Sequence, residues 1–153
     1  MRYLALAAVV ALAGCNYREP QAPSEPMSRA VPGASRQAIV DAAVAELAAE
    51  GYQPTADDKR GIVTTVPRRV RLTPEQVDCG TEAGIPLAKD DRTTTTVAWT
   101  VTAADGSVTA STHIDFDYLP SNPSWGKSGT AASTGVIERQ AVDRIAARCP
   151  AAR

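Results

Sequence analysis

The sequence has little of what most catalytic and metal sites require. It contains one His among 153 residues, three Cys, and neither a Gly-x-Ser-x-Gly nor a His-Glu-x-x-His motif. A single His excludes any site that needs two imidazoles, and we expect no cofactor. The formal net charge is −1, which lacks the basic excess of a dedicated nucleic-acid binder. We therefore expect no nucleic-acid partner.

The longest apolar run is also short. Arg2 supplies a positive charge, and residues 4–13 are an unbroken apolar stretch. As a helix this stretch would rise about 15 Å, half of a hydrocarbon core of roughly 30 Å, so it fits an export signal better than a membrane span. The run ends in Leu12-Ala13-Gly14-Cys15. This tetrapeptide resembles the lipobox of bacterial lipoproteins.

The resemblance implies that residues 1–14 are a signal peptide and that Cys15 becomes the lipidated N-terminus, with the membrane as a partner through the lipid. Asn16 favours the outer membrane, facing the periplasm, over the inner membrane in this family. Residues 15–34 contain Pro20, Pro23, Pro26 and Pro32 and have almost nothing apolar to bury. They are interpreted as a lipidated, Pro-rich tether without a fold.

Residues 35–150 are predicted to form a single α+β domain. Apolar residues recur at helical spacing between Ser35, a candidate N-cap, and Gly51, and again from residues 133–134 to Pro150. Between the helices the pattern predicts strands at 52–55, 61–66 and 68–72 and a hairpin around Asp105-Gly106. The expected order is α-β-β-β-β-β-α, an antiparallel sheet of four or five strands with both helices on one face.

The hairpin prediction includes a register. A two-residue Asp-Gly loop suits a type I′ turn and pairs residues whose numbers sum to 211. One face is then mainly apolar, and the other is polar and solvated. The apolar face pairs Val97 with Ile114, Trp99 with Thr112, Val101 with Ala110 and Ala103 with Val108. The polar face pairs Thr94 with Asp117, Thr96 with Asp115, Ala98 with His113, Thr100 with Ser111 and Thr102 with Thr109.

Cys79 and Cys149 are an even pair in a chain expected to reach an oxidising compartment. A disulfide between them is the favoured interpretation, with two buried free thiols as the alternative. A catalytic Cys is disfavoured because there is no Cys-x-x-Cys motif and only one His.

Three sets of residues are candidates for chemistry or binding. One predicted strand face carries His113, Asp115 and Asp117, which could hold a metal or form a general base. Same-face positions on a strand lie about 7 Å apart, so a solvated polar face is the favoured interpretation. Arg69 and Arg71 could meet an anionic group, or could protect an edge strand. Trp125, in a Gly/Ser/Pro loop, either folds over the core margin or is a contact anchor.

Two functions follow from these observations. The first is a non-catalytic, lipid-anchored accessory or binding module of the cell envelope, whose partner is an envelope protein or an anionic envelope polymer. The second is a small metal-binding protein or hydrolase-like enzyme centred on His113. The succession of helix, Gly51-Tyr52, turn and Gly61-Ile62-Val63-Thr64-Thr65 loosely resembles small envelope lipoproteins, including accessory lipoproteins of the outer-membrane barrel-assembly machinery. That resemblance supports the first hypothesis in fold and compartment, and transfers no site residue.

Overall fold

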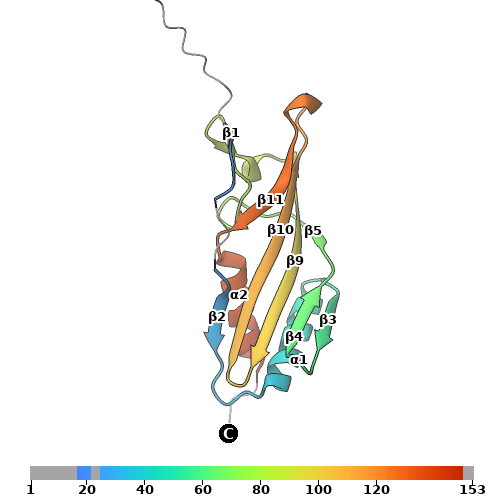
Figure 1. Ribbon diagram of the computed structural model, residues 1–153, viewed down its shortest axis with the longest axis vertical. Helices are drawn as coiled ribbons and strands as arrows, with labels where there is room; N and C mark the ends of the chain where they lie inside the picture. Colours follow the sequence, from blue (N-terminus) through green and yellow to red (C-terminus); the bar gives the residue numbers. More distant parts are fainter. Residues whose placement is uncertain (1–16, 22–24, 150–153) are drawn as a thin grey trace, which may run out of the picture.

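The computed structural model describes residues 17–21 and 25–149 (Figure 1). The predicted signal peptide and the lipidation site Cys15 lie outside the described residues. Within the described part, no helix is both long and apolar enough to cross a membrane. The helices are α1 (Arg36–Ala49), α2 (Val136–Arg148) and the short 3-10 turns η1 (Leu87–Lys89) and η2 (Pro123–Trp125). The strands are β1 (Tyr17–Arg18), β2 (Met27–Ala30), β3 (Pro54–Asp57), β4 (Ile62–Thr65), β5 (Arg68–Val70), β6 (Val77–Asp78), β7 (Thr81–Glu82), β8 (Ile85–Pro86), β9 (Thr93–Ala104), β10 (Ser107–Tyr118) and β11 (Lys127–Ser133).

The long β9–β10 hairpin is the centre of the fold, and its predicted register is confirmed. Val101 pairs with Ala110 and His113 with Ala98, and all the other predicted pairs are also formed. The predicted type I′ turn is wrong, because only Gly106 (φ +77°) of the two central residues has a positive φ and Asp105 does not. The strands alternate buried and accessible residues along most of their length, so one face of the hairpin is covered and the other is not.

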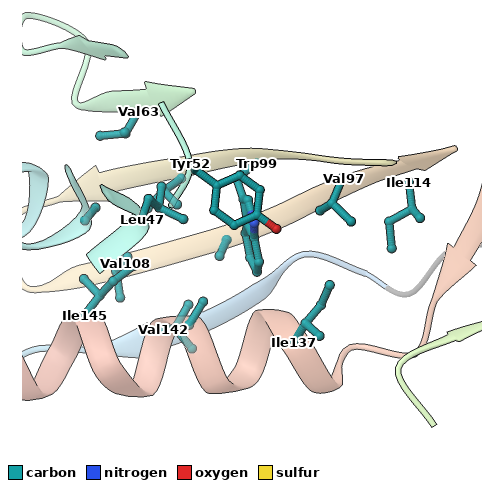
Figure 2. Close-up of a cluster of buried hydrophobic side chains, with 14 of the residues drawn as sticks. Leu47, Tyr52, Val63, Val97, Trp99, Val108, Ile114, Ile137, Val142 and Ile145 are labelled. Carbon is teal, nitrogen blue, oxygen red and sulfur yellow. The ribbon is translucent and has the colours of Figure 1, made fainter. Parts of the chain in front are cut away.

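Both helices pack on the covered face, as predicted, and enclose the apolar core between themselves and the sheet. Leu47 of α1 and Ile145 of α2 are fully buried there (Figure 2). Trp99 and Tyr52 pack edge to face, with ring centroids 6.2 Å apart. Burial of these apolar side chains supplies the main driving force for the α-on-β arrangement.

The ends of α1 are formed by the residues that the sequence predicts. The Ser35 side chain accepts a hydrogen bond from the Ala38 N–H, and Gly51 follows the helix with a φ of +82°. Arg68 donates to the Glu50 carbonyl at 2.6 Å and covers the C-terminal end of the helix. The guanidinium of Arg68 also lies over the Tyr52 ring, 5.4 Å from its centroid.

Buried carboxylates join the helices to each other and to the sheet. The side chain of Glu46 on α1 is 6% exposed and accepts from Nε of Arg144 and of Arg148 on α2, each at 2.5 Å. Burial by itself raises the pKa of Glu46, but the two arginine hydrogen bonds outweigh it and lower that pKa. Glu138, in the first turn of α2, accepts from the hydroxyls of Thr112 and Ser133.

The sheet is larger than predicted. The main sheet has eight strands in the order β3-β4-β9-β10-β11-β6, with β2 added to β10 and β5 to β9. The five predicted strands are all present with shifted ends, and α2 begins at Val136 after Gly135. The composition of residues 119–133, which include Trp125, predicts one Gly/Ser/Pro-rich loop, and this prediction was wrong because Lys127–Ser133 forms β11. Its Gly, Ser and Ala residues have low strand propensity, so its conformation comes from pairing with β10.

The tether assignment for residues 15–34 also requires correction. Tyr17 and Arg18 pair with Glu82 and Thr81, and β1, β7 and β8 form a separate three-stranded sheet. Residues 27–30 pair with β10 at positions 107–110. The described domain therefore begins well before residue 35. Composition alone could not reveal this because each pairing partner lies more than 60 residues away in sequence.

The predicted disulfide is not formed. Cys79 and Cys149 are both free thiols, Cys79 buried and Cys149 partly so. Cys79 directly follows β6, which pairs with the end of β11 just before α2 starts, whereas Cys149 lies at the opposite end of α2. A helix of 13 residues rises about 20 Å, and a disulfide requires Cα atoms within about 7 Å. The fold therefore separates the two thiols.

The candidate binding surface

The sheet carries a polar face on the side opposite the helices. We call this surface the outer face and define it by the polar residues of β9 and β10 whose side chains point away from the core. Thr predominates because β-branched residues suit strands and its hydroxyl tolerates solvent. The outer face comprises Thr94, Thr96, Thr100, Thr102, Thr109, Ser111, His113, Asp115 and Asp117.

The structure brings together two of the three residues named as the weaker, metal-binding alternative. His113 Nε2 lies 3.2 Å from Asp115 Oδ1, and these side chains are 65% and 55% exposed. Asp115 also accepts from the Thr130 hydroxyl at 3.4 Å. Asp117 lies two residues beyond Asp115 on β10, and its strand partners are Thr94 on β9 and Ser128 on β11. In the described part of the chain, no group of three His, Cys, Asp or Glu residues is placed to hold a metal ion.

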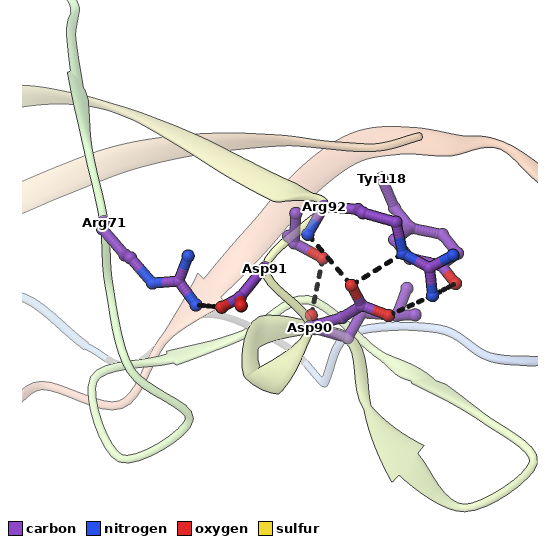
Figure 3. Close-up of polar contacts among 7 residues, drawn as sticks. Arg71, Asp90, Asp91, Arg92 and Tyr118 are labelled. Atoms are coloured by element: carbon purple, nitrogen blue, oxygen red, sulfur yellow. Dashed lines mark hydrogen bonds and ion pairs between the residues drawn. The ribbon is translucent and has the colours of Figure 1, made fainter. Parts of the chain in front are cut away.

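The two candidate arginines have different surroundings. Arg69 pairs with Thr96 in the sheet and is exposed at its margin. Arg71 follows β5, and its guanidinium forms an ion pair with Asp91 (Figure 3). Because Asp91 already compensates the charge of Arg71, the structure does not provide two free guanidinium groups for one anionic ligand.

Sequence analysis missed an ion pair beside Arg71. Arg92 donates to both carboxylate oxygens of Asp90, at 2.9 Å and 2.6 Å, and to the Tyr118 hydroxyl at 3.3 Å (Figure 3). These hydrogen bonds from Arg92 hold the pKa of Asp90 at about 2. The sequence feature that could have indicated this ion pair is Asp90, two positions before Arg92, just before a strand begins. The pair lies at the start of β9, where the Thr93 N–H donates to the Asp90 carbonyl.

Trp125 is exposed at the tip of the β10–β11 connection. Its side chain belongs to η2, where Asn122 accepts from the Ser124 N–H, and the residue is 61% exposed. Leu119, at the other side of the same connection, is 69% exposed. Of the two predicted positions for Trp125, the structure therefore shows the exposed one.

A groove that the sequence did not predict lies between β1 and β11. Its volume is about 420 Å³, and Tyr17, Phe116, Lys127 and Gly129 are among the residues that line it. The Lys127 ammonium lies 5.3 Å from the Tyr17 ring centroid and links the two walls. Sequence analysis could not find this groove because one wall lies in the segment interpreted as a tether and the other in the segment interpreted as a loop.

Comparisons with known proteins find partial likeness to two solved structures. No protein-family model matches the sequence, and no curated protein is significantly similar to it. A TBP-like protein from Parabacteroides distasonis aligns with a TM-score of 0.48 and 17% identity over 69% of this chain and 64% of that chain. A DUF4468 family protein from Bacteroides ovatus aligns with a TM-score of 0.45 and 17% identity over 68% of this chain and 58% of that chain. The chain thus spans less than two thirds of either structure.

Proposed function

We propose that this protein is a lipid-anchored accessory module of the bacterial cell envelope, which faces the periplasm from the outer membrane and binds an envelope component without catalysing a reaction. The lipobox-like Leu12-Ala13-Gly14-Cys15 supports the anchor. The observation that carries the binding role is the outer face. In the described part of the chain both helices pack against the opposite side of the sheet, so these two twelve-residue strands keep a polar surface open.

The chemistry of the outer face favours a protein over an anionic polymer as the partner. Its Thr and Ser hydroxyls both donate and accept hydrogen bonds, as a polar protein surface requires. Asp115 and Asp117 would repel an anionic polymer, and Arg71 is already paired with Asp91. At the β5 margin of the sheet, Arg68 and Arg69 carry positive charge, and Arg68 is engaged with the Glu50 carbonyl and the Tyr52 ring.

The metal or hydrolase alternative is supported by one contact, between His113 and Asp115. An oriented imidazole needs such a carboxylate, but a metal site needs further ligands, and catalysis requires a site that shields the reaction from water. Both side chains are more than half exposed. Metal analysis of the purified protein and of His113→Ala tests this alternative directly. Stoichiometric metal that is lost on substitution would overturn the non-catalytic proposal.

Crosslinking in intact cells tests the binding proposal. The full chain is expressed, crosslinked, purified from membranes and analysed by mass spectrometry, first for a lipid on Cys15 and then for a partner. Thr100→Arg introduces a large charge in the middle of the outer face and should abolish the specific crosslink. Asp58→Arg, in the exposed β3–β4 turn, is the matched control and should retain it. An unmodified Cys15 would refute the anchor, and an equal crosslink in both variants would refute the outer face as the binding surface.

A further inference from the structure

Large apolar side chains are exposed at four positions of the described chain. They are Val66 (56% exposed), Ile85 (61%), Leu119 (69%) and Trp125 (61%). Single exposed apolar residues are common and require no explanation, whereas a group at one place does. Whether these four residues indicate a contact surface therefore depends on whether they lie at one place.

Three of the four lie at the same end of the molecule. Ile85 pairs with Glu82, which pairs with Tyr17 of β1. The Tyr17 ring lies under Lys127, which starts β11 two residues after Trp125. Figure 1 shows β1 and the tip of the β10–β11 connection at one end of the long axis, and the β9–β10 turn at the other. We call Ile85, Leu119 and Trp125 the β1-end patch.

The predicted lipid attachment is close in sequence to the β1 end. Cys15 precedes Tyr17 by two residues, and two fully extended residues span about 7 Å. Tyr17 is held in the domain by its pairing with β7 and by Lys127. A lipid on Cys15 would therefore keep the β1 end, and no other end, within reach of the bilayer surface.

We propose that the β1-end patch docks into the interfacial region of the membrane that holds the lipid anchor. This inference rests on the proposed lipidation of Cys15. Trp favours the membrane–water interface, where its ring is half solvated, and Leu and Ile add apolar area beside it. Leu119 and Trp125 belong to the β10–β11 connection and Ile85 to β8, and contacts from two separate segments suit a fluid lipid surface. Docking would hold the long axis of the domain upright and direct the outer face sideways.

The two tryptophans of the chain allow a direct test. The full-length protein is purified with its lipid and reconstituted into vesicles of phosphatidylethanolamine and phosphatidylglycerol with brominated acyl chains. Trp125 is 61% exposed and Trp99 is 3% exposed, so Trp99 is an internal reference. Brominated lipid should quench most of the Trp125 emission, and Trp125→Phe should abolish this quenching while Trp99 remains fluorescent.

Charge substitutions separate docking from simple tethering. Leu119→Asp keeps the Trp125 reporter and should abolish its quenching by lipid, because the substituted tip would leave the interface. Val66→Asp, at an equally exposed apolar residue outside the patch, should leave the quenching unchanged. A lipidated Cys15 with Trp125 accessible to acrylamide but not to brominated lipid would overturn docking and leave the anchor intact. An unlipidated Cys15 would overturn both proposals.

Discussion

Replacement of Gly80 by Ala should release β1 from the domain while the rest of the fold stays intact. Gly80 has a φ of +85°, and a Cβ atom there would lie 2.4 Å from the Arg18 carbonyl oxygen. It would also lie 3.2 Å from the Tyr17 ring. Rotation of a side chain cannot relieve contact with a backbone oxygen, so β1 itself must move.

The size of the effect follows from how weakly β1 is held. It forms two residue pairs with β7, and net backbone hydrogen bonds are worth about 1 kcal/mol each. The contact of Lys127 with the Tyr17 ring adds about 0.5–1 kcal/mol. The left-handed conformation alone costs a non-Gly residue about 1–2 kcal/mol. Steric overlap with Arg18 adds to that cost, so the total is of the same order as the free energy that holds β1, about 3 kcal/mol.

Trypsin cleavage after Arg18, followed by mass spectrometry, measures the release. Gly80→Ala should expose this bond and speed its cleavage several-fold without changing the thermal unfolding of the domain by more than a few degrees. Gly84→Ala is the matched control, because Gly84 has a φ of +81° but no atom within 4 Å of the added Cβ. If both variants are cleaved at the wild-type rate, β1 is not held by the contacts described.

Three further predictions concern ionisable groups. Glu46→Gln should lower the free energy of unfolding by about 2 kcal/mol in urea titrations, more than Glu50→Gln, because the Glu46 side chain is 6% exposed and that of Glu50 31%. Hydrogen bonds from Arg92 lower the pKa of Asp90 to about 2, so the ion pair stabilises the fold fully above about pH 4. The difference in free energy of unfolding between wild type and Asp90→Asn, about 1 kcal/mol at neutral pH, should shrink below pH 4 and vanish only below pH 2. Burial raises the pKa of Cys79 to about 12, so iodoacetamide should alkylate Cys149 first and Cys79 only after the protein unfolds. A reducing agent should leave Tm unchanged. Protection of both thiols until a reducing agent is added would instead indicate a disulfide.

The sequence predicts local structure well where one segment specifies its own partner. The β9–β10 register followed from a two-residue turn and strict alternation, and α1 followed from Ser35 and Gly51. Strands β2 and β11 were missed because Ser and Ala in both, and Gly in β11, do not favour a strand. Such segments become strands when a long, already formed strand such as β10 offers free backbone groups.

The candidate sites show the same limit. Alternation placed His113 and Asp115 on the solvent side, as the structure shows, but spacing along one strand could not give the 3.2 Å contact between them. The exposure of Trp125 depends on where its loop ends, which no local pattern specifies. The disulfide prediction was wrong because it counted thiols without knowing that α2 lies between them.

The N-terminal segment contributes to the fold, beyond the linking role that the sequence predicted for it. β1 pairs in the small sheet with β7, and β2 pairs in the large sheet with β10, so the segment joins two sheets that share no strand. Residues 114–118 of β10 pair with β11, and the groove of about 420 Å³ lies between β11 and the β1 region. A pull on the N-terminus would therefore first load the two residue pairs of β1 before it reached the large sheet. If Cys15 carries the proposed lipid, the distance between the domain and that lipid would therefore depend on whether β1 is paired.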